Sequence, residues 1–299
     1  MRTLFLSALL SVLLMAPAQA ALRVLTCEPE WAALTRELAG DLVEVGAATT
    51  ALQDPHRIEA RPSLLAKARR ADLLICTGAE LEMGWLPLLQ REAGNGRIQP
   101  GQPGYFEASA QVSLLERPAR LDRAQGDVHA AGNPHVQLDP HRVARIAEAL
   151  AQRLAQLDPA NAGRYAERNT DFQGRWQAAI ARWEAQGARL KGVPVVVHHK
   201  AFTYLTDWLG LVEVGDLEPK PGVEPSAAHL AGLLETLRVR PARMVLRPAY
   251  LSSRPSQWLS QKAGIPAVEL PYTVGGAPGT DDLFGLFDVT LARLLAAAP

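Results

Sequence analysis

Seven histidines are spread along the 299-residue chain, and three of them stand where a metal site would need them. His56 and His135 lie in polar loops, and His199 follows the β-branched run 193–197 almost directly. Asp281 comes just before the last apolar segment. Imidazole suits zinc, and it also suits manganese or iron when a carboxylate assists. If these four side chains converge, they make a closed four-coordinate set for a divalent metal.

Spacing alone does not establish such a cluster, because histidines far apart in sequence are usually unrelated. His141 has another explanation: Asp139 is a natural N-cap and Pro140 the first residue of a helix, so His141 marks a helix start. His229 falls inside a predicted amphipathic helix and is expected to be structural. His129 is expected to be a solvated loop residue, with a role in metal capture left open.

The histidines must be positioned by regular elements, and the first half of the chain alternates strands with helices. Short apolar runs predict strands, and segments with a three-to-four residue period predict helices. The expected strands are 22–26, 42–45 and 72–76, and the expected helices are 31–38 and 62–70. Such alternation is typical of a parallel α/β sheet, in which ligands bind beyond the carboxyl ends of the strands.

The middle of the chain predicts long helices and the last third returns to the α/β pattern. Residues 143–157 are helical, and 160–190 predict a second helix of about thirty residues, with Trp176 and Trp183 on one side. The later strands are expected at 193–197, 211–214, 243–246 and 267–270, and the later helices at 201–209, 227–237, 255–263 and 282–297. We expect two similar α/β lobes, 21–158 and 192–299, joined by one long rigid helix, 159–191, with the metal site in the cleft between them.

Composition and the N-terminus indicate an exported binding protein. Lys plus Arg and Asp plus Glu number 31 each, so no basic field favours nucleic acid or anionic lipid. Residues 1–20 combine one Arg, an apolar run and the ending Ala18-Gln19-Ala20, which predicts a signal peptide cleaved after Ala20. The chain is therefore expected to be periplasmic and free of an anchor. It is also expected to be a monomer.

Two cysteines, Cys27 and Cys76, end the first and third predicted strands. In the flavodoxin-like strand order these strands are neighbours, so the cysteines can be bridged in an oxidising compartment. The alternative is two small buried apolar residues. Both interpretations stay open from the sequence.

Five segments resemble the metal-binding proteins of ATP-binding-cassette importers for zinc and manganese, across nearly the whole mature length. These segments are Asp54-Pro55-His56 with Pro62-Ser63; residues 71–73 and 78–82; Asn133-Pro134-His135 with 138–140; His199-Lys200-Ala201-Phe202-Thr203-Tyr204; and Glu224-Pro225-Ser226. The resemblance implies the metal ligands His56, His135 and His199, the last in preference to His198. It also implies a carboxylate before the last helix, placed at Asp281 with Asp282 as the alternative.

The resemblance implies periplasmic capture of one divalent ion, with zinc expected over manganese, and delivery to the membrane permease of an importer. A long loop rich in histidine and acidic residues, found in many zinc-specific members, is nearly absent, because residues 121–131 hold one histidine. The alternatives are a manganese- or iron-binding member of the same family, a secreted zinc hydrolase, or a peptide or cofactor receptor. No His-Glu-x-x-His pattern supports a hydrolase, so we expect no enzyme.

Overall fold

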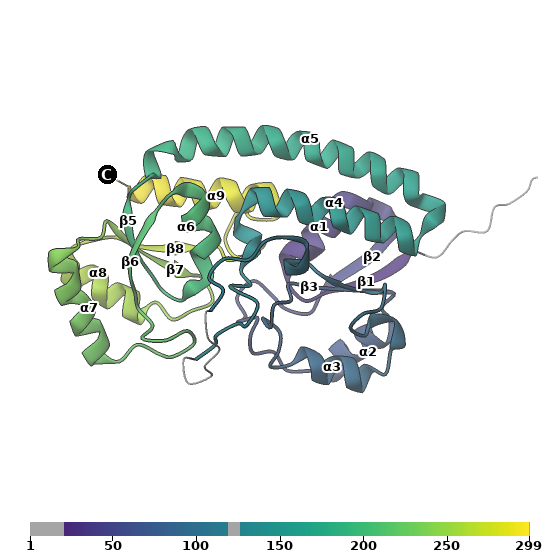
Figure 1. The fold of residues 1–299 in the computed structure, drawn as a ribbon, viewed down its shortest axis with the longest axis horizontal. Helices are drawn as coiled ribbons and strands as arrows, with labels where there is room; N and C mark the ends of the chain where they lie inside the picture. The colour runs from purple at the N-terminus through teal and green to yellow at the C-terminus, as the bar shows by residue number, and fades with distance from the viewer. Residues whose placement is uncertain (1–20, 119–125, 299) are drawn as a thin grey trace, which may run out of the picture.

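The computed structural model describes residues 21–118 and 126–298, and within these it contains two four-stranded parallel sheets (Figure 1). The first lobe is built on β1 (Leu22–Thr26), β2 (Val43–Ala47), β3 (Leu73–Cys76) and β4 (Tyr105–Glu107). The second lobe is built on β5 (Pro194–Val197), β6 (Val212–Asp216), β7 (Met244–Pro248) and β8 (Ala267–Leu270). The strand orders are β2-β1-β3-β4 and β6-β5-β7-β8, so the two lobes repeat one topology. The predicted signal peptide lies outside the described residues.

Helices cover both faces of each sheet. In the first lobe these are α1 (Pro29–Ala39), α2 (Pro62–Arg70), α3 (Leu86–Ala93) and α4 (Pro140–Leu157). In the second lobe they are α6 (Thr203–Leu209), α7 (Ala227–Val239), α8 (Arg254–Ala263) and α9 (Leu283–Ala297). The two-lobe α/β fold predicted from the sequence is confirmed. The structure adds β4 and α3, which the sequence analysis did not predict.

The long helix α5 (Ala162–Gly187) runs along both lobes, as Figure 1 shows. It has 26 residues, shorter than predicted because a 3₁₀ turn, Ala188–Leu190, takes up the end of the periodic stretch. The indole nitrogen of Trp176 donates to the main-chain oxygen of Pro140 at the start of α4, at 2.8 Å. The indole nitrogen of Trp183 donates to Asp288 of α9, at 2.6 Å. The helix is therefore fastened to both lobes.

One apolar cluster extends across both lobes. Because successive strand residues point to opposite faces, Val24 and Leu73 face the side of the first sheet covered by α1 and α4, whereas Leu74 faces α2 and α3. The cluster that holds Val24 and Leu73 also holds Val195 and Leu246 of the second sheet. The lobes thus share a core, and a wide hinge motion would have to break it.

Cys27 and Cys76 form a disulfide, with Cα atoms 4.7 Å apart. The bond lies at the carboxyl ends of β1 and β3, which pair in parallel. This decides between the two interpretations of the cysteines in favour of the bridge. Among the described residues, no helix combines the length and the apolar run that crossing a lipid bilayer requires.

Candidate metal centre

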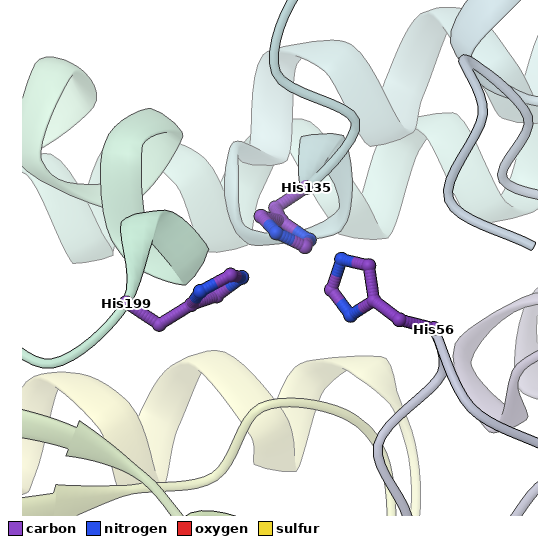
Figure 2. A group of neighbouring side chains, drawn as sticks. All are labelled: His56, His135 and His199. Carbon is purple, nitrogen blue, oxygen red and sulfur yellow. The ribbon is translucent and has the colours of Figure 1, made fainter. Parts of the chain in front are cut away.

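His56, His135 and His199 meet in one place, although the first and the last are 143 positions apart in the chain. One ring nitrogen of each lies within 4.8 Å of those of the other two. The ring centroids are 5.3 Å apart for His56 and His199, and 5.4 Å apart for His135 and His199. Figure 2 shows the three rings turned toward one another. His198 is buried as well, but it is not in this group.

The loop of His56 follows β2 and is shaped by its own sequence. One carboxylate oxygen of Asp54 accepts from both the main-chain nitrogen of His56, at 3.0 Å, and its Nδ1, at 2.7 Å. The indole of Trp85 donates to the main-chain oxygen of Pro55. At Gly84 a Cβ would stand 2.7 Å from the main-chain oxygen of His56, so only glycine permits this close approach. The loop is thereby held against the start of α3.

His135 lies just before α4 and is held by Asn133. The side-chain oxygen of Asn133 accepts from the main-chain nitrogen of His135, at 2.9 Å. Its amide nitrogen donates to the main-chain oxygen of Lys200, at 2.9 Å. The hydroxyl of Tyr204 donates to the main-chain oxygen of Asn133. The Asn-Pro-His segment of the first lobe therefore interlocks with the His-Lys-Ala-Phe-Thr-Tyr segment of the second.

His199 stands at the carboxyl end of β5 with a positive φ of 68°. Such a backbone is strained for a residue with a side chain and is concentrated at functional sites. Asp216 accepts from its main-chain nitrogen, at 3.2 Å, and Glu218 accepts from its Nδ1, at 2.9 Å. Glu218 is itself fixed by the main-chain nitrogen of Gly222. These contacts hold the ring in the cleft.

The hydrogen bonds at Nδ1 determine which nitrogen each ring offers. A carboxylate accepts hydrogen bonds and donates none, so Asp54 and Glu218 fix the Nδ1–H tautomers of His56 and His199. The Nε2 atoms of these two histidines are buried and have no hydrogen-bond partner among the described residues. The third ring, His135, has its Nδ1 at 2.8 Å from the hydroxyl of Tyr272. Unprotonated Nε2 atoms turned toward a common point are what a metal ion binds.

The electrostatics of the site favour neutral imidazole at His135. Burial lowers the pKa of His135 well below 6.5, and the neighbouring charges of His199 and His56 lower it further. At His199 burial also acts to lower the pKa, but the hydrogen bond and charge of Glu218 outweigh it, so the pKa is raised. The three rings therefore favour a positive charge between them only when it takes the place of protons, as the charge of a metal ion does.

The predicted carboxylate ligand does not join the three histidines. Asp281 is exposed, and it is absent from the group of converging side chains. Asp282 is exposed too and caps α9, accepting from the main-chain nitrogen of Gly285 at 2.7 Å. The ligand was predicted here because the position precedes the last helix. In the structure this stretch lies at the surface, at the N-terminus of α9.

His129 lies much closer to the centre than the sequence suggested. Its ring centroid is 5.7 Å from that of His56 and 6.4 Å from that of His135. Together with His135 and His199 it lines a cavity of about 90 Å³. Its segment is attached to both lobes, since Asp127 donates from its main-chain nitrogen to Pro221 and Ala130 from its own to the carboxylate of Glu80. Nothing in the local sequence indicates this attachment.

The remaining histidines behave as predicted. Asp139 caps α4 by accepting from the main-chain nitrogens of His141 and Arg142, and the exposed ring of His141 contacts Glu184. The ring of His229 contacts the main-chain oxygen of Asp216. Among the described residues one further group has metal-ligand types, Cys27, Cys76 and Glu82. Its two sulfur atoms are joined in the disulfide and are not available as thiolates.

Comparisons with known proteins identify the family. Residues 24–297 match the family model described as zinc-uptake complex component A, periplasmic (ZnuA). The chain is 25% identical over 235 residues to the zinc-binding lipoprotein AdcA of Streptococcus pneumoniae, covering 77% of this chain and 46% of that protein, so it spans about half of that relative's length. It is 26% identical over 253 residues to the manganese ABC transporter substrate-binding lipoprotein PsaA of Streptococcus pneumoniae, covering 82% of this chain and 77% of that one.

A crystal structure of ZnuA has the same fold, with a TM-score of 0.76, 24% identity, and coverage of 93% of this chain and 99% of that chain. The matched family is one of solute-binding proteins and not of enzymes. The three converging histidines of the chain have the residue types and the spacing of a divalent-metal site. The match over nearly the whole described length shows that the chain belongs to the ZnuA family of periplasmic metal-binding proteins of ABC importers.

Proposed function

We propose that this chain captures one divalent metal ion, zinc in preference to manganese, and delivers it to the membrane permease of an ABC importer. His56, His135 and His199 are the ligands, and the chain acts as a monomer. The observation that carries this proposal is the convergence of three imidazoles whose Nδ1 atoms are all hydrogen-bonded, which leaves their Nε2 atoms for the metal.

The donor set supports zinc. Nitrogen ligands suit zinc, whereas manganese favours carboxylate, carbonyl and water oxygens, and zinc lies above manganese in the order of divalent affinities. The carboxylates of Asp54 and Glu218 are occupied by the Nδ1 atoms of the ligands. The names of the relatives include both metals, so the preference rests on the chemistry of the ligands.

The fourth position goes to His129 in this proposal, because its ring centroid is 5.7 Å from that of His56 and 6.4 Å from that of His135, so a small shift of its loop would bring it to the ion. Burial lowers its pKa to about 4, with help from the charges of His56 and His199, so its ring is neutral and able to ligate. Four protein ligands leave no open position for a reactive water, which suits transport and not hydrolysis.

Export is part of the same proposal. Residues 1–20 are a signal peptide cleaved after Ala20, and the Cys27–Cys76 disulfide fits the oxidising periplasm. Protein isolated from the periplasm should begin at Ala21 when its N-terminus is sequenced. Retention of residues 1–20 in the mature protein would contradict this assignment.

The metal preference is tested with the metal-free mature chain, without an affinity tag that contains histidine. In competition at neutral pH, zinc should displace manganese and bind one ion per chain. His199→Gln should weaken zinc binding by more than the roughly 100-fold upper range seen for outer-shell changes. The matched control is His141→Gln, an exposed histidine on α4, which should bind like the wild type. Equal binding by H199Q and the wild type would contradict the site, and displacement of zinc by manganese would contradict the preference.

Delivery requires the intact cell membrane. Zinc-loaded chain added to spheroplasts of the source organism should stimulate zinc uptake, whereas the H199Q variant should not. Stimulation by both would show that capture at this site is not needed for delivery.

A further inference from the structure

The three ligand rings have different hydrogen-bond partners, and one of these partners comes from the opposite side of the cleft. Asp54 supports His56 within one loop of the first lobe, and Glu218 supports His199 within the second. His135 belongs to the first lobe, but the group that contacts its Nδ1 is the hydroxyl of Tyr272, which follows β8 in the second lobe. Of the three, His135 alone has an Nδ1 partner from the opposite lobe.

Tyr272 is itself firmly placed. It is 2% exposed, and its main-chain oxygen accepts from the side chain of Gln137, at 3.3 Å. The next residue, Thr273, donates from its hydroxyl to the buried carboxylate of Glu30 on α1. The ring of Tyr272 packs edge-on against His135, with centroids 5.6 Å apart, and against Tyr250, with centroids 5.1 Å apart. The segment after β8 is thus attached to the first lobe on both sides of the phenol.

We propose that Tyr272 is a positioning residue for metal binding: its hydroxyl accepts from Nδ1–H of His135 and so aims Nε2 of that ring at the ion. This inference rests on the proposed function, because it assumes that His135 is a ligand. The first-lobe part of the site, His56 and His135, is then complete only while the segment after β8 lies against His135. A ligand histidine without such a partner is free to rotate or to carry its proton on Nε2, where it blocks the metal.

The test is Tyr272→Phe, which removes one oxygen and keeps the ring that packs against His135 and Tyr250. The matched control is Tyr250→Phe, because the hydroxyl of Tyr250 is buried and has no hydrogen-bond partner in the part of the chain that the structure describes. Three quantities are measured for each protein: the zinc Kd by competition with a chelator, the visible spectrum of the complex at saturating cobalt, and the Tm of the metal-free form.

Y272F should raise the zinc Kd about 10- to 100-fold, the range for outer-shell partners of metal ligands, and should change the cobalt spectrum. Y250F should match the wild type in both. The cobalt spectrum, recorded well below the Tm, reports ligand geometry and does not respond to a loss of stability alone. A Kd within twofold of wild type with an unchanged spectrum would overturn the role of Tyr272, as would an equal loss in Y250F. If the wild type itself binds no zinc, the proposed function fails instead.

Discussion

Asn133 of the first lobe donates a hydrogen bond to the main-chain oxygen of Lys200, the residue that follows the second-lobe ligand His199. The same side chain accepts from the main-chain nitrogen of His135. One amide therefore spans two metal ligands that are 64 positions apart in the chain. The distance between His135 and His199 is set in part by this single residue.

Replacing Asn133 by Asp keeps the acceptor for His135 but turns the donor into a carboxylate facing the oxygens of Lys200 and Glu116. We expect a loss of about 1–3 kcal/mol in the free energy of unfolding, seen as a Tm lower by a few degrees, and weaker zinc binding. Calorimetry and zinc competition measure the two effects. Gln177→Glu, the same change at an exposed position of α5, should leave both unchanged. Wild-type Tm and Kd in N133D would show that the amide does not space the ligands.

His129→Ala tests the fourth ligand. Loss of one of four imidazoles should weaken zinc binding, but less than loss of a triad member, because the ring of His129 lies outside the group of three converging side chains. Titration of both variants against the same chelator gives the comparison. An unchanged Kd in H129A would assign the fourth position to solvent.

The disulfide should stabilise the folded chain. Cys27 and Cys76 are separated by 49 residues, for which loop-closure entropy gives about 4 kcal/mol. Replacing both by Ser should lower the Tm by several degrees, with the zinc Kd little changed because the two sulfurs belong to a group separate from the three histidines. The wild type treated with a reductant should melt like the double variant. A reduced wild type that melts like the oxidised form would mean that the bridge adds no stability.

A pH-dependent stability is expected from the buried carboxyl of Glu30. Burial raises its pKa from 4.5 to about 7, so the folded state holds a proton that the unfolded state has lost between these values. The stability contributed by the protonated carboxyl is therefore fully present below about pH 4.5 and is lost as the pH rises through 7.

Glu30→Gln mimics the protonated form and should remove this loss. The Tm of the metal-free variant should equal that of the wild type near pH 5 and exceed it near pH 8, as measured by thermal melts across this range. Glu92→Gln, at an exposed position of α3, should give no such divergence. A constant difference between E30Q and wild type at all pH values would contradict a raised pKa at Glu30.

Local features of the sequence predicted much of this molecule. Two features have a sequence pattern that can be recognised without tertiary context. They are the β-branched strand before His199 and the aromatic side of α5, with Trp176 and Trp183. The strand β4 (Tyr105–Glu107) has three residues, too few to show a period, so it was missed. Asp54 and His56 are two residues apart, and their contact is a property of the loop.

The remaining partners of the ligands are set by packing between the lobes. Tyr272 and His135 are 137 residues apart, and no spacing rule relates them. The placement of Asp281 rested on its register before the last helix, and register fixes a position along the chain without fixing the direction of the side chain. The main-chain bonds that attach the segment of His129 to both lobes likewise have no sequence signature.

The continuous apolar cluster has a consequence for how this protein can be divided. A fragment ending before α5 would leave α4 without Trp176, whose indole donates to the main-chain oxygen of Pro140, and the complementary fragment would present Trp176 to water. Neither piece is expected to survive alone as a soluble module, despite the duplicated strand order. The two lobes are therefore expected to fold and unfold together as one cooperative unit.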